Sequence, residues 1–371
     1  MTEVAVAYAT HQPLQIAEVS LSELAAHDVL VRIEASGLCH SDVSVQSGAL
    51  PFPTPIILGH EGAGVVEEVG PAVTGVAPGD HVVLSAIIAC GRCASCQRGT
   101  PNLCEWGLPT IFSCLQPDGG FRARDADGRD LYQFACLGTL ARRAIVPDLA
   151  VIPISRDVPF EAAALVGCGV LTGVGAVLNR ARIRPGDSVA VIGCGGVGLN
   201  VIQAARLAGA TTVIAIDPQP TKRDLATDFG AGDLIDPQAE DVLERVMELT
   251  GGRGVDYAFE CVGIGALVRQ AWDAIAIDGT VVAIGVAATE DVCELPAQAF
   301  STSEKTLMSC LYGTARPRID MPLYLELYRQ GRLKLDELVT RRYALSEVNE
   351  AVADLESGRN ARGVVVFASD S

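Results

Sequence analysis

A glycine-rich turn between a strand pattern and a helix pattern constrains the fold of this chain more than any other feature. The apolar run at residues 187–192 leads directly into Gly193-Cys194-Gly195-Gly196-Val197-Gly198. Beyond the turn, small apolar residues recur at helical spacing, at Val197, Val201, Ala205 and Ala208. A buried strand that ends in G-x-G-x-x-G and continues as a helix is typical of the first βα unit of a parallel, doubly wound sheet.

The same turn predicts a dinucleotide site. The next strand pattern, 212–216, ends at Asp217, which follows Gly198 by 19 positions, close to the spacing at which this motif places an acidic residue. Gly193 permits the tight turn, Gly195 lets a pyrophosphate approach the backbone, and Gly198 lets the helix contact the sheet. Asp217 would accept hydrogen bonds from the adenosine ribose and repel a 2′-phosphate, which favours NAD over NADP. The alternative interpretation is an ordinary strand–turn–helix without a ligand.

The segments after the turn continue this pattern. The first helix offers free N–H groups and a partial positive charge to the phosphates, so the predicted cradle also includes Gly196 and Val197. Further strand patterns occur at 256–260 and 280–284, with helix patterns between them. Alternation of strand and helix predicts an α/β fold with a parallel Rossmann sheet.

The rest of the chain shows a different pattern of predicted elements. With 371 residues, it is longer than one core usually serves, so we expect two domains. Residues 4–160 show short strand patterns and turns typical of a β-rich lobe, and polar residues 108–132 are predicted to form a long surface excursion. After residue 313 too few elements remain for a separate core, so this tail is expected to fold back on the lobe. The predicted division is a β-rich domain at 1–169 and 313–371, with a dinucleotide-binding domain at 170–312.

Four cysteines in one short segment predict a metal site. Cys90, Cys93, Cys96 and Cys104 follow the pattern C-x2-C-x2-C-x7-C, which brings four thiolates to one tetrahedral centre. An iron–sulfur cluster usually takes its fourth ligand from another position, and disulfides would need an oxidising compartment. Arg92 and Arg98 are expected to donate hydrogen bonds to the thiolates. Because a tetrathiolate zinc leaves no open position, the chemistry is expected elsewhere.

Composition excludes several classes of partner. A formal charge of −17 disfavours nucleic acid and anionic membranes, which need clustered Lys and Arg. The N-terminal residues lack the basic and long apolar regions of a signal peptide, and no run reaches the length of a membrane span. Twelve cysteines in this context indicate free thiols or metal ligands, and hence a reducing cytoplasm.

Several motifs together resemble one family. They are Gly-Leu-Cys-His-Ser-Asp at Cys39, Gly-His-Glu-Gly at His60, the four-cysteine segment, Val-Gly-Cys-Gly at Cys168 and the glycine-rich turn. Their order is similar to that of the zinc-containing medium-chain alcohol dehydrogenases over essentially the whole chain. The resemblance implies a discontinuous GroES-like catalytic domain. It also implies a catalytic zinc held by Cys39, His60 and Cys168, with Glu61 close behind the metal and a substrate oxygen in the fourth position.

The resemblance implies further roles for single residues. Ser41 is similar to the hydroxyl that takes the alcohol proton, but Ser44 stands where many members have the histidine that ends the relay, so that last step stays open. Ala86 replaces a frequent aromatic residue, which implies a wider pocket near the zinc. Residues implied to contact the cofactor, or alternatively to be surface or packing residues, are His40, Thr172, Lys222 and Arg362.

The activity implied is a reversible hydride transfer between a primary alcohol and NAD that gives an aldehyde, with aromatic and long-chain alcohols as candidate substrates. Two alternatives are a dehydrogenase acting on a thiol adduct of formaldehyde and a nicotinoprotein that does not release its NAD. A third, from another class, is a zinc-stabilised protein that senses NAD without catalysis. The resemblance also implies a homodimer, with a tetramer as the alternative.

Overall fold

The computed structural model describes residues 1–367, and its contacts divide the chain into two compact units. The second unit consists of Gly169–Ala315 and Arg332–Lys334, and the first unit contains the rest. Lys334 returns to the second unit because its backbone N–H donates to Oε1 of Gln203 at 2.8 Å. The predicted limits of this unit are residues 170 and 312, and the short segment Arg332–Lys334 was not predicted to belong to it.

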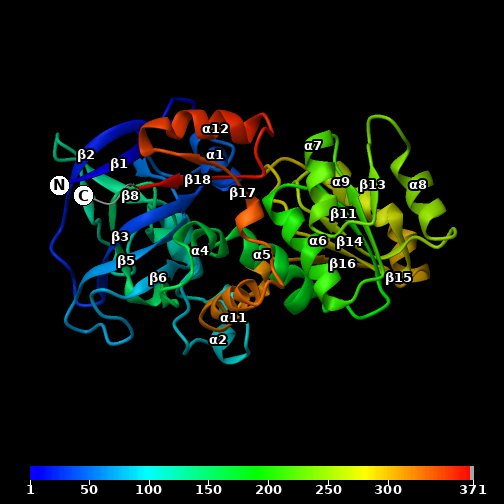
Figure 1. Ribbon diagram of the computed structural model, residues 1–371, viewed down its shortest axis with the longest axis horizontal. Helices are drawn as coiled ribbons and strands as arrows, with labels where there is room; N and C mark the ends of the chain where they lie inside the picture. Colours follow the sequence, from blue (N-terminus) through cyan, green and yellow to red (C-terminus); the bar gives the residue numbers. More distant parts are fainter. Residues whose placement is uncertain (368–371) are drawn as a thin grey trace. The chain divides into compact units, whose positions relative to one another are not determined.

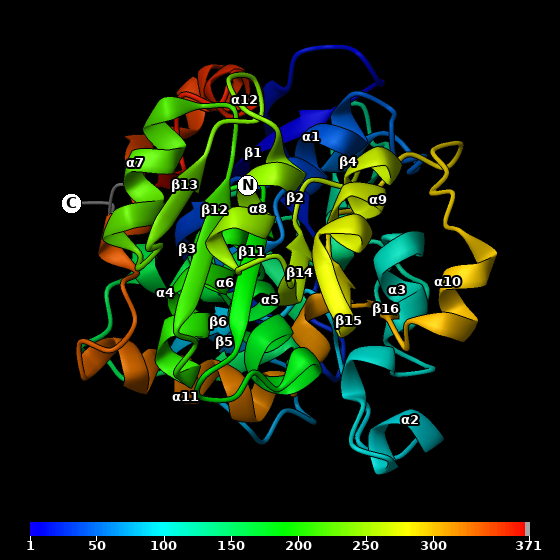
Figure 2. The same ribbon diagram turned by 90° about the vertical axis from the view of Figure 1, so that its right-hand side faces the viewer.

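The second unit contains one parallel sheet of six strands (Figure 2). Its order is β13-β12-β11-β14-β15-β16, and each neighbouring pair is parallel. The chain order reverses between β11 and β14, and the crevice at that point, outside the carboxyl ends of the strands, is where such sheets bind ligands. The strands are β11 (Ser188–Ile192), β12 (Thr212–Ile216), β13 (Asp233–Ile235), β14 (Val255–Glu260), β15 (Ile275–Ala283) and β16 (Thr306–Ser309).

Both faces of this sheet are buried, as expected for a parallel sheet. Ala190 and Ile214 face a cluster that includes Val246 of α8 and Trp272 of α9. On the other face Val191 lies against the start of α6. The helices of the unit are α5 (Gly169–Gly175), η4 (Ala176–Ala181), α6 (Gly196–Ala208), α7 (Pro220–Asp228), α8 (Val242–Leu249), α9 (Gly265–Ala274), α10 (Ala297–Thr302) and η5 (Tyr312–Thr314).

The first unit is rich in β-structure (Figure 1). A closed barrel has the order β1-β2-β7-β8-β4, formed by β1 (Thr2–Ala7), β2 (Gln15–Leu21), β7 (Ala123–Arg124), β8 (Asp130–Gln133) and β4 (Ile56–Ile57). A second sheet has the order β10-β6-β5-β3-β18-β17, with β9 also paired to β3. Its strands are β10 (Val151–Pro153), β6 (His81–Leu84), β5 (Glu61–Val69), β3 (Asp28–Gly37), β18 (Arg362–Val366), β17 (Val339–Tyr343) and β9 (Arg143–Pro147). The predicted fold class, a Rossmann sheet beside a β-rich GroES-like domain, is confirmed.

The C-terminal segment returns to the first unit. β18 pairs antiparallel with β3 and parallel with β17, so the end of the chain completes a sheet that begins near residue 28. The helices of the unit are α1 (His40–Gln46), α2 (Ala94–Gln97), η1 (Pro101–Leu103), α3 (Leu108–Ser113), η2 (Phe134–Cys136), η3 (Asp148–Ala150), α4 (Phe160–Val166), α11 (Pro317–Arg329), η6 (Asp336–Leu338), η7 (Leu345–Glu347) and α12 (Val348–Glu356).

The prediction of a long surface excursion at residues 108–132 is wrong. This segment supplies α3, β7 and much of β8, and Leu131 is fully buried. The prediction assumed that the polar residues of this segment lie on the surface, but one of them, Arg122, is buried with a partner. Arg122 and Asp28 are 7% and 3% exposed, and the guanidinium donates to both carboxylate oxygens, at 2.5 and 3.2 Å.

Within residues 1–367, no helix taken singly has the length and apolar composition needed to cross a membrane. One bent pair of helices, Phe160–Val166 followed by Gly169–Ala181, meets these criteria by length and composition alone.

Replacing Arg122 by leucine should reduce the free energy of unfolding of the first unit by about 3–5 kcal/mol, because the Asp28 carboxylate would stay buried without its partner. The matched control is Arg124→Leu, since Arg124 pairs with Asp130 on the surface, where the two side chains are 64% and 36% exposed. That change should cost less than about 1 kcal/mol. Denaturant unfolding followed by fluorescence checks both, and equal effects would contradict the assignment.

Candidate active site and metal centres

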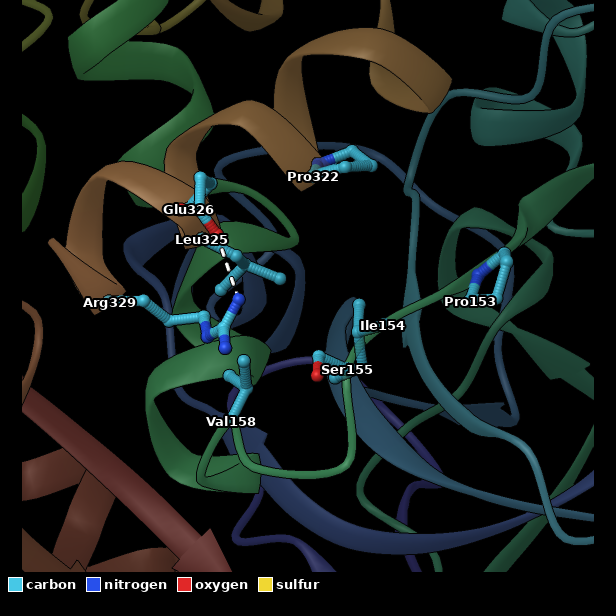
Figure 3. A pocket seen from close by; sticks show the side chains of 8 residues that line it. All are labelled: Pro153, Ile154, Ser155, Val158, Pro322, Leu325, Glu326 and Arg329. Atoms are coloured by element: carbon cyan, nitrogen blue, oxygen red, sulfur yellow. Dashed lines mark hydrogen bonds and ion pairs between the residues drawn. The ribbon is translucent and has the colours of Figure 1, made fainter.

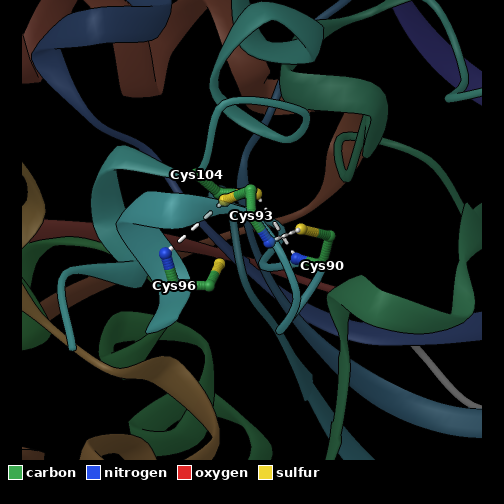
Figure 4. Close-up of side chains that lie close together, drawn as sticks. All are labelled: Cys90, Cys93, Cys96 and Cys104. Carbon is green, nitrogen blue, oxygen red and sulfur yellow. Dashed lines mark hydrogen bonds between the residues drawn. The ribbon is translucent and has the colours of Figure 1, made fainter. Parts of the chain in front are cut away.

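The four cysteines of the predicted zinc loop converge. Their Sγ atoms all lie within 4.8 Å of one another, and Figure 4 shows the four side chains turned toward a common point. Backbone amides donate to the sulfurs: Cys93 N to Cys90 Sγ at 3.4 Å, and Gly107 N to Cys104 Sγ at 3.3 Å. Four thiols at this separation fit a tetrahedral, closed zinc site.

Local structure explains how the loop closes. Cys93 is the N-cap of α2, and its sulfur accepts the N–H of Cys96. This contact, together with the N–H of Glu105, lowers the pKa of the Cys93 thiol to about 6. Arg98, expected to reach the thiols, instead donates to Ser95 Oγ at 3.3 Å. The thiolate charge is therefore stabilised by amides.

A second cluster joins Cys39, His60, Glu61 and Cys168, whose candidate ligand atoms also lie within 4.8 Å of one another. Cys39 caps α1, His60 precedes β5, and Cys168 follows α4. The first unit therefore brings together the three ligands that the family resemblance implied, from segments far apart in the sequence. Two thiols and one imidazole fit a catalytic zinc with an open position.

The two thiols of this cluster titrate as a pair. Their hydrogen bond lowers the pKa of Cys39 well below its usual value and raises the pKa of Cys168 well above it. Since zinc binds thiolates, metal binding would favour the deprotonated form of both thiols and release protons.

Asp42, which the sequence analysis missed, holds the ligand segments together. Its carboxylate accepts the N–H of Cys39 at 3.1 Å and the N–H of Gly59 at 2.9 Å, and it lies 3.2 Å from Nδ1 of His60. A carboxylate cannot donate, so Nδ1 carries a proton, and Nε2 is the nitrogen that would bind a metal. The available signal was an acidic residue at the third position of a helix that a candidate ligand caps.

Glu61 and Arg362 form a buried ion pair behind the cluster. They are 0% and 4% exposed, and the guanidinium donates to Oε2 of Glu61. Burial raises the pKa of Glu61, and the Arg362 charge opposes that rise. Arg362, implied by resemblance to reach the pyrophosphate, lies here at the start of β18 against Glu61.

The remaining predicted residues of the first unit lie on or near α1. Ser41 Oγ is 3.8 Å from Cys39 Sγ, and Ser44 follows one turn later on the same helix. His40 is exposed. Ala86 is 7% exposed.

In the second unit, the glycine-rich turn has the geometry of a phosphate cradle. Gly193 has a φ of +91°, and a Cβ on Gly198 would lie 1.9 Å from Gly193 O, so both positions require glycine. A Cβ on Gly195 would meet nothing within 4 Å, which leaves open space at the N-terminus of α6. Gly196 and Val197 begin that helix and present their N–H groups there.

The other predicted dinucleotide residues of this unit flank the turn. Asp217 is 4% exposed, and its carboxylate accepts the N–H of Cys194 at 2.8 Å and the N–H of Gln219 at 2.8 Å. Lys222 is half-buried on α7, and Thr172 is buried on α5. Arg223, which the sequence analysis missed, donates to Asp217 O at 2.7 Å and pairs with Asp236.

A surface cavity of about 370 Å³ lies in the first unit beside α11 (Figure 3). Arg329 and Glu326 form an ion pair at this cavity. The predicted site residues do not line it.

Replacing Asp42 by alanine should weaken zinc binding at the three-ligand cluster by about 10- to 100-fold, because His60 would lose the partner that fixes its tautomer. Zinc per chain, measured against increasing chelator, checks this, and the four-cysteine site serves as an internal reference. The control is Asp80→Ala, whose carboxylate accepts the N–H of Ala77 in a surface turn. Unchanged zinc retention in the Asp42 variant would contradict the assignment.

Comparisons with known proteins agree with this geometry. Residues 25–156 match the family model of the alcohol dehydrogenase GroES-like domain, and residues 196–330 match that of the zinc-binding dehydrogenases. The chain is 42% identical to an NDMA-dependent alcohol dehydrogenase of Amycolatopsis methanolica, with all of both chains covered. It is 39% identical to an S-(hydroxymethyl)glutathione dehydrogenase of Saccharomyces cerevisiae, covering 97% of this chain and 95% of that one.

A solved structure is similar over the same length. The crystal structure of benzyl alcohol dehydrogenase from Acinetobacter calcoaceticus has a TM-score of 0.93 and 30% sequence identity, with 99% of each chain covered. Two family models, full-length relatives above 30% identity and two convergent ligand clusters point to one family. The chain belongs to the zinc-containing alcohol dehydrogenases of the medium-chain type.

Proposed function

We propose that this protein transfers hydride reversibly between a primary alcohol and NAD, producing the aldehyde. The observation that carries the proposal is the convergence of Cys39, His60 and Cys168 on one point, on a chain that also carries a dinucleotide fold. When bound, zinc supplies a Lewis acid that favours loss of the hydroxyl proton, and NAD supplies the hydride acceptor.

The ligands and their neighbours set the charge of this centre. Two thiolates and a neutral imidazole balance the charge of Zn²⁺, so the site holds the metal without a net charge. Asp42 keeps the imidazole in the required tautomer. Arg362 balances Glu61, so that the buried carboxylate behind the cluster does not add an uncompensated negative charge.

Ser41 is proposed to receive the alcohol proton. Its hydroxyl lies 3.8 Å from Cys39 Sγ, beside the ligand cluster, and a hydroxyl both accepts and donates. Ser44, three positions later on α1, carries no group that titrates near neutral pH. We therefore propose that water, rather than a side chain at position 44, takes the proton onward.

The cofactor is proposed to be NAD, held by the cradle of Gly193, Gly195 and Gly196. Asp217 supports this choice, since a buried carboxylate at the end of β12 would repel a 2′-phosphate. Thr172, Val197, Gly198 and Lys222 are proposed to complete the contacts within the second unit. His40 and Arg362, which the family resemblance implies as further cofactor contacts, belong to the first unit.

Replacing Cys39 by serine should abolish turnover while NAD binding stays measurable, because the ligand cluster and the glycine-rich turn belong to different units. Turnover of an alcohol with free NAD and with an artificial acceptor checks the first part, and the fluorescence change of NADH on binding checks the second. Cys114→Ala is a control, since this buried thiol lies outside both clusters. Unchanged activity in the Cys39 variant would refute the proposal.

A row of aromatic rings supports an apolar or benzylic substrate. Phe134 contacts His60 edge-on, with ring centres 5.0 Å apart, Phe52 lies 5.3 Å from Phe134, and Phe112 stacks on Phe52 at 6.2 Å. Phe112 is 64% exposed. The row therefore runs from the surface to the ligand cluster, and its exposed end offers an aromatic contact to an apolar substrate.

Replacing Phe112 by alanine should raise KM for benzyl alcohol about tenfold, an energy equivalent to one aromatic contact. KM for ethanol should change little, because ethanol has no ring to stack. Phe121→Ala is a control, since Phe121 pairs with Tyr132 outside this row. Parallel changes for both alcohols would contradict a role in specificity.

Two alternatives within the same chemistry have support from relatives. One relative is named for NDMA dependence and another for S-(hydroxymethyl)glutathione. If NAD does not exchange, denaturing the purified protein should release about one nicotinamide per chain. Turnover of simple alcohols without added thiol would argue against the adduct of formaldehyde. A non-catalytic NAD sensor would need only the four-cysteine zinc, so two zincs per chain would argue against it.

We also propose a homodimer in a reducing cytoplasm, with a tetramer as the alternative. β16 is an edge strand of the sheet, and Leu307 on it is 38% exposed, as expected of a strand that another chain covers.

All twelve cysteines lie within the described residues, and each is a free thiol there. Such thiols persist where the compartment is reducing.

A further inference from the structure

A buried carboxylate lies at the edge of the sheet where the dinucleotide is expected. Glu260 is the last residue of β14, which lies between β11 and β15, and it is 0% exposed. Its Oε1 accepts the N–H of Val262 at 2.8 Å and the N–H of Gly263 at 2.7 Å. Its Oε2 has no hydrogen-bond partner among residues 1–367. Burying an acidic group with one unbonded oxygen costs free energy. A structural or functional role of Glu260 must therefore offset that cost.

The same residue joins two loops. Its carboxylate holds the turn after β14, and its backbone oxygen accepts the N–H of Ile284 at 2.9 Å and the N–H of Gly285 at 3.1 Å, from the loop after β15. The loops touch without side chains between them, since a Cβ on Gly285 would lie 1.9 Å from Gly263 N. Glu260 therefore bonds both loops from the middle strand.

The turn that Glu260 holds also contacts the glycine-rich turn. A Cβ on Gly193 would lie 2.5 Å from a methyl group of Val262, so Val262 leaves no room for a side chain at the first glycine of the motif. Val262, Ile264 and Val286 from the two loops are 45%, 45% and 66% exposed. Three partly exposed apolar side chains beside the phosphate cradle offer a surface for a flat ring.

We propose that Glu260 is a positioning residue for the dinucleotide: it ties the loops after β14 and β15 together and so sets the wall beside Gly193. The inference rests on the proposed NAD binding. Glu260 lies outside the glycine motif, and its carboxylate and backbone oxygens contact backbone N–H groups. Burial raises the pKa of Glu260, and the N–H groups of Gly263, Val262, Ile264 and Gly285 oppose that rise.

Replacing Glu260 by leucine should increase the rate of NAD release about tenfold, because the one oxygen that accepts both N–H groups is lost and the turn is freed. The rate is measured on the NAD-loaded protein by trapping released NAD with a second dehydrogenase, which works whether NAD exchanges quickly or slowly. Glu260→Gln keeps one acceptor oxygen and should stay within about threefold of the wild type. Gly285→Ala leaves Glu260 intact, forces the loops apart and should also speed release.

The matched control is Asp256→Leu, at the opposite end of the same strand. The Asp256 carboxylate accepts the N–H of Ser188 at 2.8 Å and pairs with Arg253, so its loss should lower the unfolding temperature without changing NAD release. If the Glu260→Leu protein is less stable but releases NAD at the wild-type rate, Glu260 is only structural and the proposal is overturned. A wild-type protein that binds no NAD would instead overturn the proposed function.

Discussion

The hydrogen bonds of Asp42 are the interaction on which the candidate active site depends most. One buried carboxylate bonds the backbone of Cys39 and of Gly59 and the imidazole of His60. These contacts join the start of α1 to the segment before β5, so two ligands separated by about twenty residues share one acceptor. Low local polarity strengthens each of these bonds. The ligand geometry is thus set before any metal arrives, which is what a site with an open coordination position requires.

The negative charges of the two metal clusters are stabilised in different ways. The four-cysteine loop is partly exposed and stabilises its thiolates with backbone amides, as the contacts to Cys90 and Cys104 show. In the other cluster Glu61 is fully buried, and a buried carboxylate there needs a full opposite charge, which Arg362 supplies. The difference is physical: amide dipoles suffice where water still screens the charge, whereas a fully buried ion needs a paired ion.

The sequence predicted those parts of the structure that depend on local spacing. The strand before Gly193, the helix after it and the convergence of Cys90 with its three neighbours all follow from residues close in the chain. Spacing alone did not reveal the pairing of Arg122 with Asp28 or of Arg362 with Glu61, since these partners are 94 and 301 positions apart. A polar residue looks the same in the sequence whether it is solvated or buried with a distant partner, which is why residues 108–132 were predicted to lie on the surface.

The same limit explains why residues that organise a site are harder to find than residues that form it. A ligand or a phosphate-binding glycine must have one chemical identity at one spacing, and that leaves a motif. Glu260 acts through backbone N–H groups, which every residue except proline provides, so its partners leave no trace in the sequence. Asp42 also bonds two backbone N–H groups, and only its place at the start of α1 is a sequence signal. Glu260 could be recognised only when its 0% exposure and its two amide contacts were known. The motifs of this chain therefore indicate its chemistry, but the positions of the reacting groups also depend on carboxylates whose roles the motifs do not show.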